Sequence, residues 1–201
     1  MGEKDLPKFI RENYELRDYR HALAVLIHEF KEEFYDIVNI LSNFRLNKND
    51  VIVGGGGKSP ISQKLDKAFV DRGWAKKVFV SKQEVDGNIC ETSTHEVDCF
   101  KNGIALEVEW NNKDTFFDRD LRNFRYLYDL RIISLGVIIT RSTDLRTVFN
   151  QLRDRDGKNV GDKFCTSTTH MAKLAPKLEQ GASGGCPVAV FGITSKLYVD
   201  K

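Results

Sequence analysis

The chain has 201 residues, of which 41% are hydrophobic and 30% are charged, and its formal net charge at pH 7 is +2. This composition is ordinary for one globular domain over residues 1–201, and the small net charge excludes DNA binding through a strong overall field. No apolar run approaches the ~18 residues of a membrane span, and the N-terminus lacks the layout of a secretory signal. The four cysteines follow no metal-binding spacing, so we interpret them as reduced thiols and expect a cytoplasmic protein without a membrane partner.

A long helix is predicted near the N-terminus, over residues of about 18–43. Apolar residues recur there at i, i+3, i+4 and i+7 without a break, which is the pattern of a helix that packs on a core. These residues are Leu23, Leu26, Ile27, Phe30, Phe34, Ile37, Val38 and Leu41.

A glycine run follows at residues 54–57, directly before Lys58 and Ser59. A phosphate-binding loop of the GxxxxGK[ST] type needs a glycine where Ile52 stands, so we expect no nucleotide cofactor. Ser59 is instead suited to cap a helix that has Pro60 in its first turn. The flexible glycines would let Lys58 approach a backbone phosphate of DNA closely.

Two successive hairpins are predicted in the middle of the chain. In the first, strands over residues 76–85 and 88–94 flank a tight turn at Asp86-Gly87. In the second, Asn102-Gly103 separates two apolar, β-branched runs within residues 96–110, which is the strongest short-range signal of a two-residue turn.

The register of the second hairpin would gather four carboxylates on one face. Asp98 would lie opposite Glu107 and Glu96 opposite Glu109, with facing Cβ atoms roughly 4.5–5.5 Å apart. Because like charges directly opposite destabilise a sheet, a hard divalent cation with oxygen ligands would offset them. A solvent-exposed acidic hairpin is the alternative, and a three-residue turn would shift the register and undo the pairing. The other face is apolar: Val97, Cys99, Ile104, Leu106, Val108 and Trp110.

The second half of the chain is predicted to alternate helices and strands. A polar loop at residues 111–115 precedes a helix over about 118–130, a buried strand over 134–140, and a helix over 144–153 capped by Thr143 or Asp144. A charged loop over 154–161, a helix over 169–180 that contains Pro176, and a strand over 187–194 follow. Residues 181–185 match GxSxG, but a nucleophile elbow needs a strand before Ser183 and a helix after it, so we exclude a serine hydrolase.

This order of elements, with Asp98 ahead of Glu107-Val108-Glu109, resembles the core of the PD-(D/E)xK nucleases. Within that superfamily the chain is similar to the BglII/BstYI group of type II restriction endonucleases. The matching segments span most of the chain: residues 59–61, 73–74, 95–98, 104–110, 118–121, 134–139 and 184–193. The resemblance implies an α/β fold with a mixed β-sheet flanked by helices, and a catalytic core over about 51–194.

The resemblance also implies Mg²⁺-dependent hydrolysis of DNA phosphodiesters that leaves 5′-phosphates. Asp98, Glu107 and Glu109 would be the catalytic residues, and Asp98, Glu107 and the backbone carbonyl of Val108 would hold the metal. Most of the superfamily has lysine at the position of Glu109, whereas BglII-like enzymes have glutamine and the BamHI type has glutamate. Glu109 is therefore compatible with activity, as a general base or as a ligand of a second metal.

The BamHI type also uses an acid further upstream in the chain, and this sequence has no clear counterpart to it. Lys76 and Lys77 occupy the nearest positions.

The implied partners are double-stranded DNA and a second copy of the chain, since a homodimer mirrors a palindromic site. We expect DNA contacts from Asn111, Asn112 and Lys113 after the catalytic strand, because asparagine reads adenine bidentately, and from Lys58 and His95. The alternatives are a repair or modification-dependent nuclease of the same fold, and a DNA-binding module that is catalytically weak or inactive.

Overall fold

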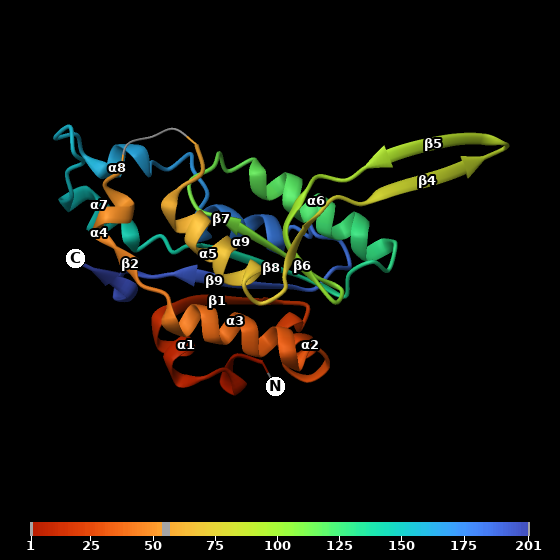
Figure 1. Ribbon diagram of the computed structural model, residues 1–201, viewed down its shortest axis with the longest axis horizontal. Helices are drawn as coiled ribbons and strands as arrows, with labels where there is room; N and C mark the ends of the chain where they lie inside the picture. The colour runs from red at the N-terminus through yellow and green to blue at the C-terminus, as the bar shows by residue number, and fades with distance from the viewer. Residues whose placement is uncertain (1, 54–56, 201) are drawn as a thin grey trace.

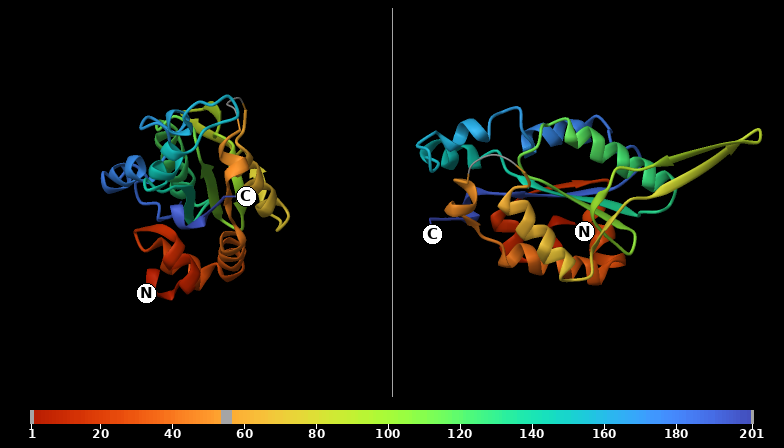
Figure 2. Two further views of the ribbon diagram at one scale, coloured as in Figure 1. Left: turned by 90° about the vertical axis from the view of Figure 1, so that its left-hand side faces the viewer. Right: turned by 45° about the horizontal axis from the view of Figure 1, so that its top comes forward.

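The computed structural model describes residues 2–53 and 57–200. A six-stranded mixed sheet lies between two layers of helices, and a long hairpin projects from one end (Figure 1, Figure 2). This arrangement confirms the predicted α/β fold with a mixed sheet flanked by helices.

The three central strands of the sheet are parallel and fully buried, as expected for strands covered on both faces. The strands outside them pair antiparallel. In spatial order the strands are β1 (Tyr14–Tyr19), β9 (Val188–Ile193), β8 (Leu135–Arg141), β7 (Ile104–Glu109), β6 (Val97–Lys101) and β3 (Ala75–Lys77).

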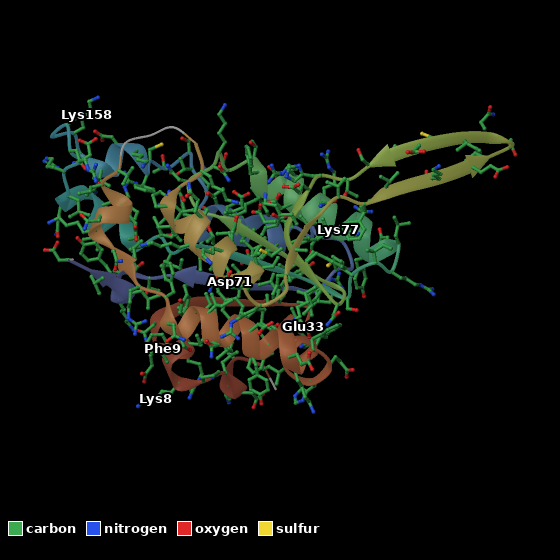
Figure 3. The ribbon with its side chains drawn as sticks, in the orientation of Figure 1. Lys8, Phe9, Glu33, Asp71, Lys77 and Lys158 are labelled. Carbon is green, nitrogen blue, oxygen red and sulfur yellow. The ribbon has the colours of Figure 1, made fainter. Side chains whose placement is uncertain are left out.

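Each face of the sheet has its own apolar core. One core packs beneath α1 (Lys8–Asn13), α2 (Ala22–Glu29), α3 (Lys31–Asn43) and α5 (Pro60–Val70), and the other beneath α6 (Phe116–Asp129) and α9 (Met171–Glu179). The end opposite the projecting hairpin carries α4 (Lys48–Val51), α7 (Leu145–Gln151), α8 (Val160–Lys163) and the parallel pair of β2 (Leu46–Asn47) with β10 (Tyr198–Val199) (Figure 1). Lys158, labelled in Figure 3, lies at that end.

The prediction of one helix over residues 18–43 is wrong in two ways. Residues 14–19 form β1, and Arg20 and His21 then turn the chain with positive φ of 53° and 59°. The helical part is broken at Phe30, which separates α2 from α3. The apolar periodicity runs across the break because both helices pack on the same core, while Asp18 accepts a hydrogen bond from the amide of Leu23 and stabilises the start of α2.

The helix after the glycine run is confirmed, since Ser59 accepts a hydrogen bond from the amide of Ser62 and Pro60 opens α5. Glycines 54–56, which we expected to bring Lys58 near a phosphate, lie outside the described residues.

The central hairpin is also confirmed, with Asn102 and Gly103 at positive φ of 46° and 86° and Lys101 opposite Ile104. Asn102 donates a hydrogen bond of 2.7 Å to Glu33, which Figure 3 labels beside this turn.

The first predicted hairpin is interrupted at residues 78–79. Its opening segment is β3 in the main sheet, and only β4 (Val80–Val85) and β5 (Asn88–Ser93) form the projecting pair, which we call the arm (Figure 1). Lys77, labelled in Figure 3, lies where the chain leaves the sheet for the arm.

The remaining predicted elements are present, with differences at their ends. Neither Thr143 nor Asp144 caps α7 through its side chain, and the loop over residues 154–161 leads into the unpredicted short helix α8. Ser183 is fully buried and donates to a backbone carbonyl, which agrees with excluding a serine hydrolase. No helix in the described part of the chain is long and apolar enough to cross a membrane. The four cysteines are free.

Candidate active site

At the open end of the central hairpin, hydrogen bonds from backbone amides to the side chains of Asp98 and Glu107 replace the backbone pairing of the two strands. The ladder between β6 and β7 ends at Cys99 and Leu106. Beyond it, the amide of Asp98 donates to Glu107 Oε2 at 3.3 Å, and the amide of Val108 donates to Asp98 Oδ2 at 3.4 Å. The two carboxylates are therefore brought together as the predicted register required, at the point where the strands separate.

Glu96 does not join this pair, so the prediction of four carboxylates from the hairpin is wrong. The pairing of β3 with β6 shifts register between Ala75 and Lys77, which leaves an extra residue in β6. Such a bulge reverses the alternation of faces. Val97 consequently packs in the core beneath α6 rather than with Cys99, and Glu96 is exposed and forms an ion pair of 2.8 Å with Lys76.

The fourth carboxylate comes from helix α6 instead of the hairpin. Asp120 is fully buried beside Glu109, and Arg119 joins the two, at 2.7 Å from Asp120 and 3.2 Å from Glu109. The side-chain amide of Asn112 donates to the other oxygen of Glu109 at 2.7 Å. Glu109 is thus held in place from both sides by neutral and cationic donors.

A fifth acid, Asp66, approaches the same site from helix α5. Lys58 forms an ion pair with Asp66 and lies 3.8 Å from Asp98, so its ammonium group bridges the two carboxylates. Asp66 precedes Asp98 in the chain and shares Lys58 with it, a proximity that the sequence alone did not reveal. Its position in the middle of an amphipathic helix gave no signal of chemistry.

Burial raises the pKa of the acids at the centre of this cluster. It raises the pKa of Glu107 far above the ordinary value, and the charges of Asp120 and Asp98 add to the effect. Burial likewise raises the pKa of Glu109 to about 9 and that of Asp120 to about 6. Carboxylates with such a strong tendency to retain protons mark a site that stabilises positive charge.

The donors fit a hard divalent cation. Glu107 Oε1 and Asp120 Oδ2 are buried and accept no hydrogen bond in the described structure, and carboxylate oxygen is the ligand that Mg²⁺ prefers. No group of three His, Cys, Asp or Glu side chains within residues 2–53 and 57–200 is already arranged around one point for a metal. Lys58 and Arg119 offset the negative charge in this arrangement.

A cleft of about 710 Å³ opens over the cluster. Of the residues predicted to contact DNA, Lys58, His95, Asn111 and Asn112 line it, together with Asp98, Val108 and Glu109. Lys113 is exposed and pairs through its backbone with Thr168 at the edge of the loop. Arg119, from helix α6, also lines the cleft.

A family model described as restriction endonuclease BglII/BglIII matches residues 14–193. The match begins at the first residue of β1 and ends at the last residue of β9, so it contains the whole sheet and the acidic cluster. No curated protein matches the chain.

Proposed function

The chain belongs to the BglII/BglIII restriction endonuclease family and is a DNA nuclease, and from this we propose that it is a Mg²⁺-dependent type II restriction endonuclease. It hydrolyses double-stranded DNA at a short palindromic site and leaves 5′-phosphates. The observation that carries the proposal is the buried acidic cluster in the floor of a cleft lined by Lys58 and Arg119.

Asp98, Glu107 and the backbone carbonyl of Val108 would hold the magnesium ion. When bound, the ion polarises the scissile phosphate and lowers the pKa of a bound water. Unpaired Glu107 Oε1 supports this assignment, because a buried carboxylate oxygen without a partner is costly unless a cation binds it.

Glu109 would take the proton of the attacking water. Glu109 lines the cleft, and Asn112 and Arg119 fix both of its oxygens. The ammonium group of Lys58, at 3.8 Å from Asp98, would donate to the phosphate oxygens as negative charge develops on them. Lys58 would thus supply the cation that most of the superfamily carries at the position of Glu109.

The active unit would be a homodimer acting in the cytoplasm. Two copies related by a two-fold axis cut the two strands of a palindrome symmetrically. Asn111, Asn112, Lys113 and His95, at or beside the mouth of the cleft, would contact the DNA.

The experiment combines cleavage with mapping of the ends. Purified protein is incubated with plasmid DNA and Mg²⁺ or EDTA, beside an Asp98→Asn variant and an Asp129→Asn control, whose carboxylate is exposed on α6 and faces Arg125 at 3.8 Å. We expect discrete fragments with ligatable 5′-phosphate ends from the wild type and the control only. Cleavage of methylated DNA alone would indicate a modification-dependent nuclease, and DNA binding without any cleavage would indicate a binding module.

A further inference from the structure

A second cavity, of about 580 Å³, lies behind the loop that follows the catalytic strand. It is enclosed by the end of β8, the start of α7, the loop before α9 and the first turn of α9. Its polar lining is dominated by cations and hydroxyl groups: Arg141, Thr143, Arg146, Thr166, His170 and Lys173.

Arg141 is the principal feature of this cavity, because its guanidinium group is buried without a carboxylate partner. The residue is only 2% exposed, and the charged groups that act on it among the described residues are Cys165 and Arg146, with no carboxylate. Its Nη2 atom donates to the carbonyls of Phe164 and Cys165 at 3.4 and 3.3 Å and to the hydroxyl of Thr168. Its Nε atom has no acceptor in the described structure. A buried cation that lacks a counter-charge is costly, so an anion in the cavity would stabilise it.

The other charged groups around Arg141 reinforce the positive potential. Burial lowers the pKa of Arg141 to about 10; the charge of Arg146 acts in the same direction and that of Cys165 against it. Burial and the charge of Arg141 also lower the pKa of His170. The carboxylate that lines the cavity, Asp114, is neutralised by Lys173 at 3.2 Å.

The first turn of α9 also lines the cavity, through Ala172 and Lys173. The helix has nine residues, and its cap residue, His170, accepts no hydrogen bond from the first turn through its side chain. The amide of Ala172 bonds Thr143 Oγ1 at 3.3 Å. A helix N-terminus carries a partial positive charge that favours anions, and here it adds to a buried guanidinium group.

The loop before α9 links the cavity to the candidate active site, because His170 lines the cavity and its neighbour Thr169 bonds Asn112, which lines the cleft. The amide of Thr169 donates to the carbonyl of Asn112 at 2.8 Å, and the amide of Asn112 donates to Thr169 Oγ1 at 3.2 Å. Asn112 in turn holds Glu109. An anion bound at Arg141 would therefore lie against the segment that positions the proposed base.

We propose that this cavity is a binding site for a phosphate group, with Arg141 and Arg146 as its principal donors. In the DNA complex, the group is a backbone phosphate next to the one that is cleaved. This second statement rests on the proposed nuclease function, whereas the phosphate site itself does not. Bidentate guanidinium donors and a helix N-terminus are the chemistry that recognises phosphate.

The main test uses Arg146→Gln, because Arg146 is exposed and its loss leaves the buried contacts of Arg141 intact. Arg155→Gln is the matched control, since Arg155 is exposed, changes the same charge and does not line the cavity. Thermal stability is measured while inorganic phosphate is titrated against chloride at equal ionic strength. We expect phosphate to stabilise the wild type and the control, and Arg146→Gln to weaken that binding about tenfold.

DNA binding in EDTA is then measured by fluorescence anisotropy at several salt concentrations. We expect Arg146→Gln to reduce the slope of log affinity against log salt by about 1, which corresponds to the loss of one phosphate contact. We expect no change of slope in Arg155→Gln. Stabilisation by phosphate without a change in slope would confirm the site and overturn its role in DNA binding. Equal phosphate response in Arg146→Gln, or none in the wild type, would overturn the proposal. Failure of the wild type to bind DNA would count against the nuclease function and leave the phosphate result standing.

Discussion

Lys58 and Glu109 together show how this chain differs from the usual PD-(D/E)xK pattern. The position that usually carries lysine holds Glu109, yet Lys58 brings an ammonium group to within 3.8 Å of Asp98 from the segment before α5. A cation from another element can meet the same electrostatic need, because stabilisation of a transition state depends on where the charge lies and not on its place in the sequence.

Replacing Lys58 with glutamine tests this role. Loss of a donor to developing charge should lower kcat by about a hundredfold and change KM little. Lys64→Gln is the control, because Lys64 lies on α5, which follows Lys58, and bonds Asp50 at 2.5 Å, away from the cleft. If Lys58 only offsets the negative charge of the free enzyme, Lys58→Gln would instead raise KM and leave kcat unchanged.

The buried acids predict how stability depends on pH when no cation is present. Folding raises the pKa of Glu107 and Glu109, so their contribution is complete below the ordinary value of 4.5 and is lost as pH rises toward about 9. The free energy of unfolding should therefore fall across this range in EDTA, and less steeply in Glu107→Gln. Chemical denaturation at pH 6 and pH 8.5 measures the difference, with exposed Glu91→Gln as the control. If the free energy of unfolding fell equally with pH in the wild type and in Glu107→Gln, the raised pKa of Glu107 would be contradicted.

At the residue scale, the sequence predicted the acids that belong to one hairpin and missed those that meet it from elsewhere. Asp98, Glu107 and Glu109 follow from turn type and alternation alone. Asp66 and Asp120 arrive from two helices whose positions depend on packing across the sheet, which no local pattern encodes. The prediction that Glu96 joins the cluster failed for the same reason, because the bulge in β6 arises from pairing with β3, which no local pattern encodes.

At the element scale, the position of α6 against the sheet fixes both Arg119 and Asp120. Gly136 in β8 allows this close approach, because a Cβ atom there would lie 2.2 Å from the ring of the buried Phe124. The sequence predicted α6 and β8 correctly from their apolar patterns, but it could not show how closely they approach.

Gly136→Ala should therefore destabilise the protein by about 1–3 kcal/mol, as overpacking in a core does. Gly185→Ala is the control, because its Cβ would lie 3.4 Å from Tyr128 in ordinary contact. Chemical denaturation measures both variants. Equal stability of the two would mean that Phe124 moves aside freely.

The strand β1 illustrates why some elements were missed. Residues 14–19 alternate Tyr14 and Leu16 with charged residues, but the strong helical periodicity that begins at Leu23 obscured the boundary. The strand is stabilised by its pairing with β9, from the other end of the chain. Long-range pairing of this kind is not visible in a local window.

At the scale of the whole molecule, the arm stands apart from the body. Its two strands contact the body at their base, where Ser81 meets the hydroxyl of Tyr126. Large apolar side chains remain uncovered on it, with Val85 66% and Ile89 70% exposed. An isolated two-stranded hairpin adds little stability in water.

Shortening the arm by replacing residues 83–90 with Asn-Gly should leave Tm almost unchanged, because almost no buried surface is lost. Differential scanning calorimetry compares the shortened protein with the full chain at low concentration. A fall in Tm of several degrees would show that the arm stabilises the body.

The central claim is that the acids at the open end of β6 and β7 carry metal-dependent cleavage of DNA. Single-turnover cleavage of plasmid DNA with Mg²⁺ tests it most directly, in the wild type, Asp98→Asn, Glu107→Gln and the control Asp129→Asn. We predict a loss of at least about a hundredfold in both site variants and none in the control. Cleavage by Asp98→Asn and Glu107→Gln at the wild-type rate would contradict the claim.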